Sequence, residues 1–360
     1  PSGFLALCTA NLPEPTIGPN SDTQADDYFN TVIHTSVNEA ASINVGFKPD
    51  WIWAKSRNRV STHILVDSTR GVRKFISTNS TNAEIDSNDQ NGVDILAFTS
   101  TGFDVPDDPH GYFNYHNGSS TFDDNVFWNW KANGGTRTTF AESGNNPAGG
   151  HQANATSGFS IVDYTGTGSA GTIAHGLGAS PEITIIKKRS GAENWYYQSE
   201  LQLGAWTNNL RLDTTQATLT SSTFVTAVSD TTVTVSTSTA VNGDGTTYIM
   251  YCFRSIEGYS KIGGYTGNGN ADGTFVYTGF RPAWIIVKCT SILENWAIID
   301  NARTPNNAVT TQLFANLNIA DNTDTNQAVD ILSNGFKLRG SLDLFNTSGA
   351  TYIYMAFAEN

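Results

Sequence analysis

The residues best suited to ligand chemistry lie between positions 104 and 121. This segment is rich in carboxylate, imidazole and phenol groups, namely those of Asp104, Asp107, Asp108, His110, Tyr112, Tyr115 and His116. Tyr and His offer flat faces for sugar rings together with hydrogen-bonding tips, and carboxylates accept hydrogen bonds from hydroxyl groups. We therefore predict a ligand-binding region made of Asp107, Asp108, His110, Tyr112, Tyr115 and His116. The alternative is a contact between subunits, which exposed aromatic residues serve equally well.

The same segment raises the question of a metal ion, because its Asp and His side chains could hold calcium or magnesium. Carboxylates are mostly solvated surface groups, so we predict no metal site and no cofactor, with a structural divalent cation as the alternative. Residues 268–273 imitate the start of an EF-hand loop, but Gly279 stands where the bidentate Glu is needed. A turn rich in Asn and Gly is the simpler explanation.

Basic residues concentrate between positions 48 and 74, in a chain whose formal net charge is −13. Besides Lys48, the cluster contains Lys55, Arg57, Arg59, Arg70, Arg73 and Lys74. One interpretation is a patch that binds an anionic surface such as an acidic polysaccharide or lipopolysaccharide. The other is that these side chains pair with acids across a subunit contact.

No local motif predicts catalysis. Residues 166–171 match GxGxxG, but residues 172–181 cannot form the helix that the dinucleotide fingerprint needs. The six His form no HxH or HExxH pattern, and no Ser lies in a GxSxG elbow. We therefore predict that the chain is not an enzyme. A polysaccharide depolymerase with carboxylates paired only in space is the alternative.

Composition excludes several other classes. The net charge of −13 repels phosphate backbones and disfavours nucleic acid as a partner. No apolar run approaches the roughly 20 residues of a membrane helix. The three Cys supply no disulfide framework. The chain begins at Pro1 without Met or a basic segment, so we expect it to continue a longer protein.

The elements that position these side chains are predicted by an internal repeat. Three segments share Gly, Pro and Lys at one spacing, namely residues 46–55, 178–187 and 279–288. Eight residues after each Lys comes His63, Trp195 or Trp296, which opens a second apolar run. Trp195 and Trp296 are expected to be buried, because they occupy matching positions in those runs. Each copy ends in an aromatic strand, at residues 126–130, 248–253 and 352–357.

Apolar and polar residues alternate at period two within each copy, which is typical of strands. The predicted fold class is therefore all-β, with three tandem β-sandwich, jelly-roll-like modules at 26–131, 158–256 and 257–360. Residues 1–25 are expected to form an extended lead-in. Residues 132–157, rich in Gly, Asn and Thr, are expected to form a linker that leaves module one the more independent.

The repeat motifs resemble a known family context. Residues 157–168, 175–182 and 185–195 are similar to a module in structural proteins of marine tailed bacteriophages, and residues 67–71 and 77–84 match the same pattern. Residues 6–13 resemble the segment that joins a SPRY-like β-sandwich to such modules. The resemblance implies a tail fibre or virion surface fibre and implies no catalytic residues. Copy one departs from the pattern at His63 and in the segment 104–121.

The expected function is that of a virion surface protein that binds a glycan of the host cell through exposed aromatic residues and loops. A purely structural capsid or tube decoration is the alternative. The expected partners are other virion proteins, host surface polysaccharide and further copies of the chain. A trimer is expected because small sandwiches with 38% hydrophobic residues have limited cores.

Overall fold

The computed structural model describes residues 15–18, 21–87, 95–107, 113–115, 122–220 and 224–359. Within them the regular secondary structure is almost entirely antiparallel β-sheet, which confirms the predicted all-β class. Short helices interrupt the strands, namely α1 (Glu200–Leu203), α2 (Thr239–Asn242) and the 3-10 turns Ala25–Asp27 and Thr325–Gln327.

One order of six strands occurs in three large sheets. In the first sheet the strands lie in the order β1 (Phe29–Thr35), β9 (Asp124–Trp130), β3 (Trp51–Ser56), β4 (Ile64–Asp67), β5 (Lys74–Ile76) and β6 (Ile85–Asp86). The corresponding strands of the second are β12 (Phe159–Thr165), β20 (Thr247–Phe253), β14 (Ile183–Lys188), β15 (Tyr196–Gln198), β16 (Asn208–Arg211) and β17 (Leu219–Thr220). Those of the third are β21 (Ser260–Thr266), β29 (Thr351–Ala358), β23 (Pro282–Cys289), β24 (Trp296–Asp300), β25 (Thr311–Phe314) and β26 (Asn322–Thr323).

Each large sheet is accompanied by a three-stranded sheet formed from the same stretch of sequence. The first contains β2 (Ala41–Asn44), β8 (Gly102–Val105) and β7 (Ala97–Phe98). The second contains β13 (Gly171–Ala174), β19 (Thr232–Val235) and β18 (Val225–Val228), and the third contains β22 (Phe275–Tyr277), β28 (Gly335–Leu338) and β27 (Val329–Leu332). We call the sheet pairs β1–β9, β12–β20 and β21–β29 repeats 1, 2 and 3.

The shared Pro marks the same strand entrance in each repeat, as the spacing predicts. Pro49 and Pro181 lie two residues before β3 and β14, and Pro282 is the first residue of β23. Each of these strands lies between the last strand of its repeat and the strand that follows it in sequence. A Pro at the start of a strand removes no hydrogen bond from the ladder, so this position suits it.

The predicted linker at 132–157 is wrong. Two strands lie in it, β10 (Thr138–Phe140) and β11 (Ala148–Asn154), and β11 pairs along its whole length with β12. They extend the second sheet to eight strands. Small residues in β11, such as Gly149 and Gly150, explain the misleading composition, because close packing against Phe140, Asp163 and Arg137 leaves no room for a Cβ there.

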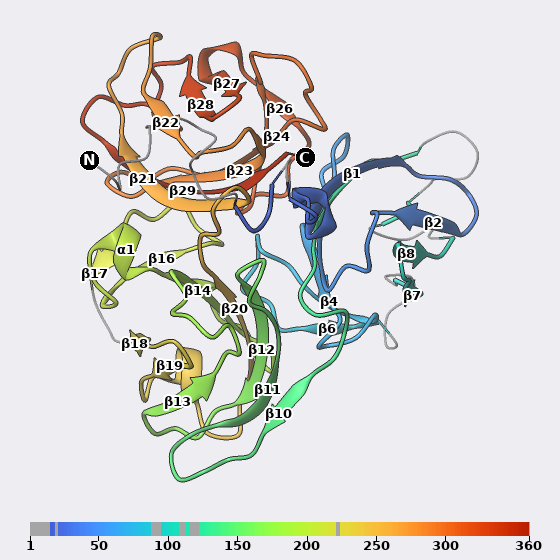
Figure 1. Ribbon diagram of the computed structural model, residues 1–360, viewed down its shortest axis with the longest axis vertical. Coiled ribbons are helices and arrows are strands. Elements are labelled where there is room, and N and C mark those ends of the chain that lie inside the picture. Colours follow the sequence, from blue (N-terminus) through green and yellow to red (C-terminus); the bar gives the residue numbers. More distant parts are fainter. Residues whose placement is uncertain are drawn as a thin grey trace, which may run out of the picture.

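Figure 1 shows the three repeats around a common centre, with repeat 1 in blue and cyan, repeat 2 in green and yellow and repeat 3 in orange and red. The centre is filled by aromatic side chains from all three large sheets. Trp51 of repeat 1 stacks on Tyr251 of repeat 2 at 4.6 Å between ring centroids, and Phe29 of repeat 1 stacks on Phe357 of repeat 3 at 5.1 Å. Repeat 1 is therefore packed against both others, and the expectation that it would be more independent is wrong.

Burial on both faces of the central strands follows from this arrangement. One face of each large sheet packs on its small sheet, and the other faces the shared centre. All six residues of β3 and the last seven of β29 are buried, which is why they read as near-continuous apolar runs.

Candidate ligand-binding cavity

The same hydrogen bond is found at each junction between repeats. Its donor is the aromatic side chain of the residue that lies eight positions after the shared Lys. The ring N–H reaches a backbone carbonyl of the neighbouring repeat in each case: Trp195 to Ser77, Trp296 to Arg211 and His63 to Phe314, each at 2.9 Å. These contacts run from repeat 2 to repeat 1, from repeat 3 to repeat 2 and from repeat 1 to repeat 3. The three repeats therefore close into a ring, and the predicted burial of Trp195 and Trp296 is confirmed.

His63 performs the role of a Trp because its neutral form has a matching N–H. Burial lowers the pKa of His63 well below its usual value. The indole N–H of Trp53 donates to Nδ1 at 2.8 Å, which leaves the proton on Nε2 to donate to Phe314. Copy one has His63 where the other copies have Trp, and the hydrogen bond at the junction is nevertheless kept.

Two of the six residues of the predicted patch for an anionic surface are not accessible to such a surface. Lys55 and Arg70 are buried, and a buried cation cannot bind an external surface. The remaining four are half-buried or exposed, namely Arg57, Arg59, Arg73 and Lys74. Several of these side chains pair with acids, as in the second interpretation, but within one chain. The pairs are Arg57 with Asp321, Arg59 with Asp123, Arg70 with Asp67 and Glu84, and Lys74 with Glu84.

Two ion pairs link repeats at equivalent positions. Arg57 of repeat 1 donates to Asp321 of repeat 3 at 3.0 Å. Arg189 of repeat 2 donates to Glu84 of repeat 1 at 2.8 Å. Burial opposes the charge of Glu84, but the hydrogen bond from Arg189 and the nearby Arg70 lower its pKa.

A polar cavity opens between repeats 3 and 1 because of one small side chain. The residue after the shared Pro is Asp50 in repeat 1 and Glu182 in repeat 2, and both carboxylates are satisfied internally. Asp50 accepts from the backbone N–H of Ala132 at 2.8 Å, and Glu182 accepts from that of Ser255 at 3.0 Å. In repeat 3 the same position is Ala283, whose methyl group leaves space for a cavity of about 300 Å³.

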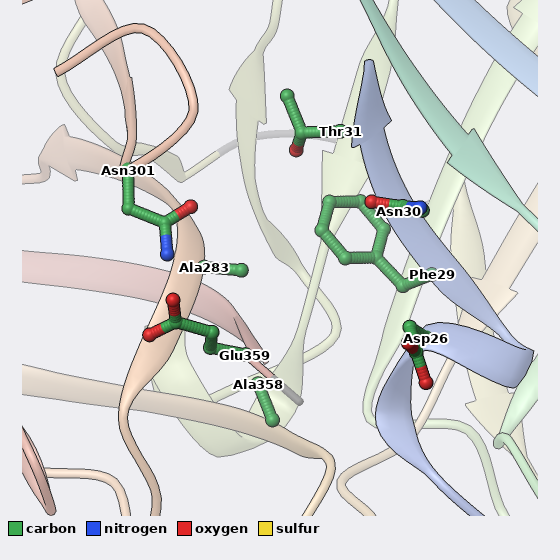
Figure 2. Close-up of a pocket in the computed structure, with 8 residues that line it drawn as sticks. All are labelled: Asp26, Phe29, Asn30, Thr31, Ala283, Asn301, Ala358 and Glu359. Carbon is green, nitrogen blue, oxygen red and sulfur yellow. The ribbon is translucent and has the colours of Figure 1, made fainter. Parts of the chain in front are cut away.

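The cavity wall carries hydrogen-bonding groups from both repeats (Figure 2). Asn301 and Glu359 come from repeat 3, and their side chains point toward one another beside Ala283. Phe29 and Thr31 of β1 face them from repeat 1. The remaining wall residues are Asp26, Asn30 and Ala358.

Two polar groups of the wall have no partner among the described residues. The buried hydroxyl oxygen of Thr31 makes no hydrogen bond there. Nor does the amide of Asn301, whose counterpart in repeat 1, Ser68, donates to Asp50 at 2.7 Å. Buried polar groups are normally paired, so the cavity offers the Thr31 hydroxyl to an occupant, and the half-buried Asn301 amide lines the same cavity. Glu359 adds a carboxylate that Arg281 neutralises.

The chemistry of this wall suits a small polyhydroxylated ligand. Amide, hydroxyl and carboxylate groups accept and donate hydrogen bonds to hydroxyls, and the ring of Phe29 supplies an apolar wall. The volume lies at the lower end of the roughly 300–1,000 Å³ of ligand sites, which suits one sugar ring. In the sequence, the residue after the shared Pro changes from Asp and Glu in repeats 1 and 2 to Ala in repeat 3. That this change is accompanied by a cavity could not be foreseen, because repeat 1 forms the other side of the cavity only when the repeats close into a ring.

The ligand-binding region predicted at 104–121 lies partly outside the described residues, which include neither Asp108, His110, Tyr112 nor His116. Asp107 is exposed. Tyr115 is half-buried beneath the guanidinium of Arg59, 4.1 Å from its ring centroid, so one ring face is occupied. Asn114 ties the segment to the sandwich by donating to the carbonyls of Glu39 and Pro106. Neither Asp107 nor Tyr115 lines the cavity.

Within the described parts of the chain, no group of His, Cys, Asp and Glu side chains could hold a metal ion. Among the same residues, no helix has the length and apolar composition of a membrane span.

A search of curated proteins and a search of solved structures each found no match to the chain. A family model described as a domain of unknown function, DUF7483, matches residues 24–360. The match covers all three repeats and both sides of the cavity. The ring of three sheet pairs described above therefore belongs to the DUF7483 family.

Proposed function

We propose that the chain is a structural protein on the surface of a bacteriophage virion, in the manner of a tail fibre or adhesin, and that it binds a glycan of the host cell. The virion assignment is supported by the resemblance of the repeat motifs to phage structural modules. The glycan assignment is supported by the cavity between repeats 3 and 1. Other virion proteins and further copies of the chain are the proposed partners.

One observation carries the binding function: the position that holds an internally satisfied carboxylate in two repeats is Ala283 in the third. At this junction the Asn301 amide is half-buried, and the buried hydroxyl of Thr31 has no partner among the described residues. Leaving a buried hydroxyl unsatisfied costs about 1–3 kcal/mol, and a sugar hydroxyl would satisfy it.

The test is a glycan array followed by calorimetry on the sugars that bind. Asn301→Ala removes one of the free polar groups, and Ala283→Asp refills the cavity with the carboxylate found in repeat 1. We expect each variant to weaken binding by about tenfold or more, which corresponds to about 1.4 kcal/mol. Asn145→Ala, at an exposed turn between β10 and β11, is the control and should bind as the native chain does.

The proposal fails if no glycan on the array binds, or if a glycan binds and Ala283→Asp leaves its affinity unchanged. Thermal unfolding of each variant distinguishes loss of binding from loss of the fold. We expect Ala283→Asp to fold, because the equivalent position already carries Asp in repeat 1.

A further inference from the structure

Two aromatic side chains are exposed next to each other on the outer edge of repeat 3. Phe275 and Tyr277 of β22 have 43% and 64% of their surface in solvent, while Val276 between them is buried. Side chains two apart in a strand point to the same face, so both rings lie on the outer face of the small sheet. β22 is the edge strand of that sheet.

The fold does not need aromatic residues at these positions. Ile43, Ile173 and Val276 occupy the same place in the three small sheets, each paired with an inward residue of the neighbouring strand. The residues on either side are Ser42 and Asn44 in repeat 1, Thr172 and Ala174 in repeat 2, and Phe275 and Tyr277 in repeat 3. Small or polar residues therefore suffice in two equivalent strands, and the aromatic pair has another role.

The ring of Phe275 lies against the backbone of the sheet. Its edge is 3.1 Å from the point that a Cβ on Gly335 would occupy, so the absence of a side chain at Gly335 lets the ring settle there. With one side packed and 43% of the residue exposed, Phe275 presents a flat apolar surface to solvent.

The aromatic pair is connected to the cavity between repeats 3 and 1. Tyr277 lines a second cavity of about 370 Å³ together with Glu257 and Lys261. That cavity shares Gly258 and Gly279 with a third cavity of about 300 Å³. The third cavity shares Glu359 with the cavity that contains Asn301. Because they share wall residues, the three cavities adjoin one another from the junction of repeats 3 and 1 along repeat 3 to β22, and we call this series of cavities the track.

We infer that this track binds a linear oligosaccharide, with one sugar unit in the cavity at Asn301 and later units reaching the rings of Tyr277 and Phe275. The inference rests on the proposed function and extends it from a single sugar to a chain. The two rings are about 7 Å apart along the strand, so they present a continuous platform to consecutive sugar rings. The exposed side chains of Glu257 and Lys261 in the second cavity can hydrogen-bond to hydroxyl groups between these points.

The experiment measures affinity against chain length. Chito-, cello- and alginate oligosaccharides of one to six units are titrated into the full chain by calorimetry. We expect at least one series to gain tenfold or more in affinity between one and four units. The double variant Phe275→Thr/Tyr277→Ala, which installs the residues of repeat 2, should remove that gain and leave the affinity for a single unit unchanged. Leu293→Ala, at a side chain of repeat 3 that is 65% exposed, is the matched control.

The outcomes separate this inference from the function on which it rests. If no oligosaccharide binds, both are wrong. If single units bind and Asn301→Ala abolishes that binding, while chain length has no effect, the cavity stands and the track is overturned. Sedimentation velocity completes the test: if the double variant dissociates an oligomer and the dependence on chain length persists, β22 is a contact between copies and the inference is wrong.

Discussion

Arg70 and Asp67 show how single residues connect the repeats. The guanidinium donates to Asp67 at 2.5 Å and to the carbonyl of Leu65 at 3.0 Å, and the hydroxyl of Tyr251 in repeat 2 donates to the same carboxylate at 2.8 Å. Burial works against the charge of Arg70, but Asp67, Tyr251 and Glu84 together raise its pKa. The pair is satisfied on all sides and is therefore part of the junction rather than a surface feature.

Arg70→Met should destabilise the fold strongly, because it leaves the buried carboxylate of Asp67 without its cation. The expected loss is about 3–5 kcal/mol in the free energy of unfolding, measured by urea denaturation. Arg137→Met, which breaks the more exposed pair with Asp163, should cost about 1 kcal/mol or less. Equal losses for the two variants would contradict the role given to Arg70.

Strand ends carry a second kind of junction contact. The shared Lys lies in β3, β14 and β23, and each ammonium is buried and donates to backbone carbonyls. Lys187 reaches Thr81 of repeat 1 at 2.8 Å, and Lys288 reaches Thr215 of repeat 2 at 3.2 Å. Burial lowers the pKa of Lys55, Lys187 and Lys288 to about 8 in each case.

These lysines should make the fold more stable as pH rises from about 8 to 10. In that window the unfolded chain holds the Lys protons, whose ordinary pKa is 10.5, while the folded chain has begun to lose them. Above about pH 10 the buried tyrosines act in the opposite direction, because burial raises their pKa in the folded state. Urea denaturation at intervals between pH 7.5 and 10 measures the rise.

Lys187→Met should reduce the rise, because it removes one of the three proton sites. Thr184→Val is the control, since it changes a buried side chain on the same strand without altering titration. A rise of unchanged size in Lys187→Met would show that the ammonium of Lys187 is not the source.

The elements were more predictable than the contacts between them. The spacing of Gly, Pro and Lys predicted the repeated strand entrance, because those residues act through local backbone geometry. The ring was not predictable, because its hydrogen bonds end on carbonyls of Ser77, Arg211 and Phe314, whose side chains have no part in accepting them. The cavity depends on that closure and on the absence of a carboxylate at Ala283. Neither the closure nor the missing carboxylate appears as a motif in the sequence.

At the scale of the whole molecule, the three repeats of one chain supply the shared buried core that three copies of the chain were expected to supply. The trimer prediction assumed small cores that need association, whereas the repeats already share an aromatic centre. Ion pairs also link the repeats, since Arg57 of repeat 1 contacts Asp321 of repeat 3 and Arg189 of repeat 2 contacts Glu84 of repeat 1. A trimer of the full chain stays a prediction that no longer rests on the size of the core.

Because the repeats close into a ring, the fold should not depend on which repeat comes first along the chain. Each junction is complete without a covalent link, and Ala25 and Glu359 line one cavity. A circular permutant that joins residue 359 to residue 15 through a short Gly/Ser linker, and so keeps the buried Ile17, and that opens the exposed turn at Gly144 should therefore fold. We expect its melting temperature to fall by a few degrees at most, measured by circular dichroism. A permutant that stays unfolded would mean that the order of synthesis, and not only the set of contacts, determines this architecture.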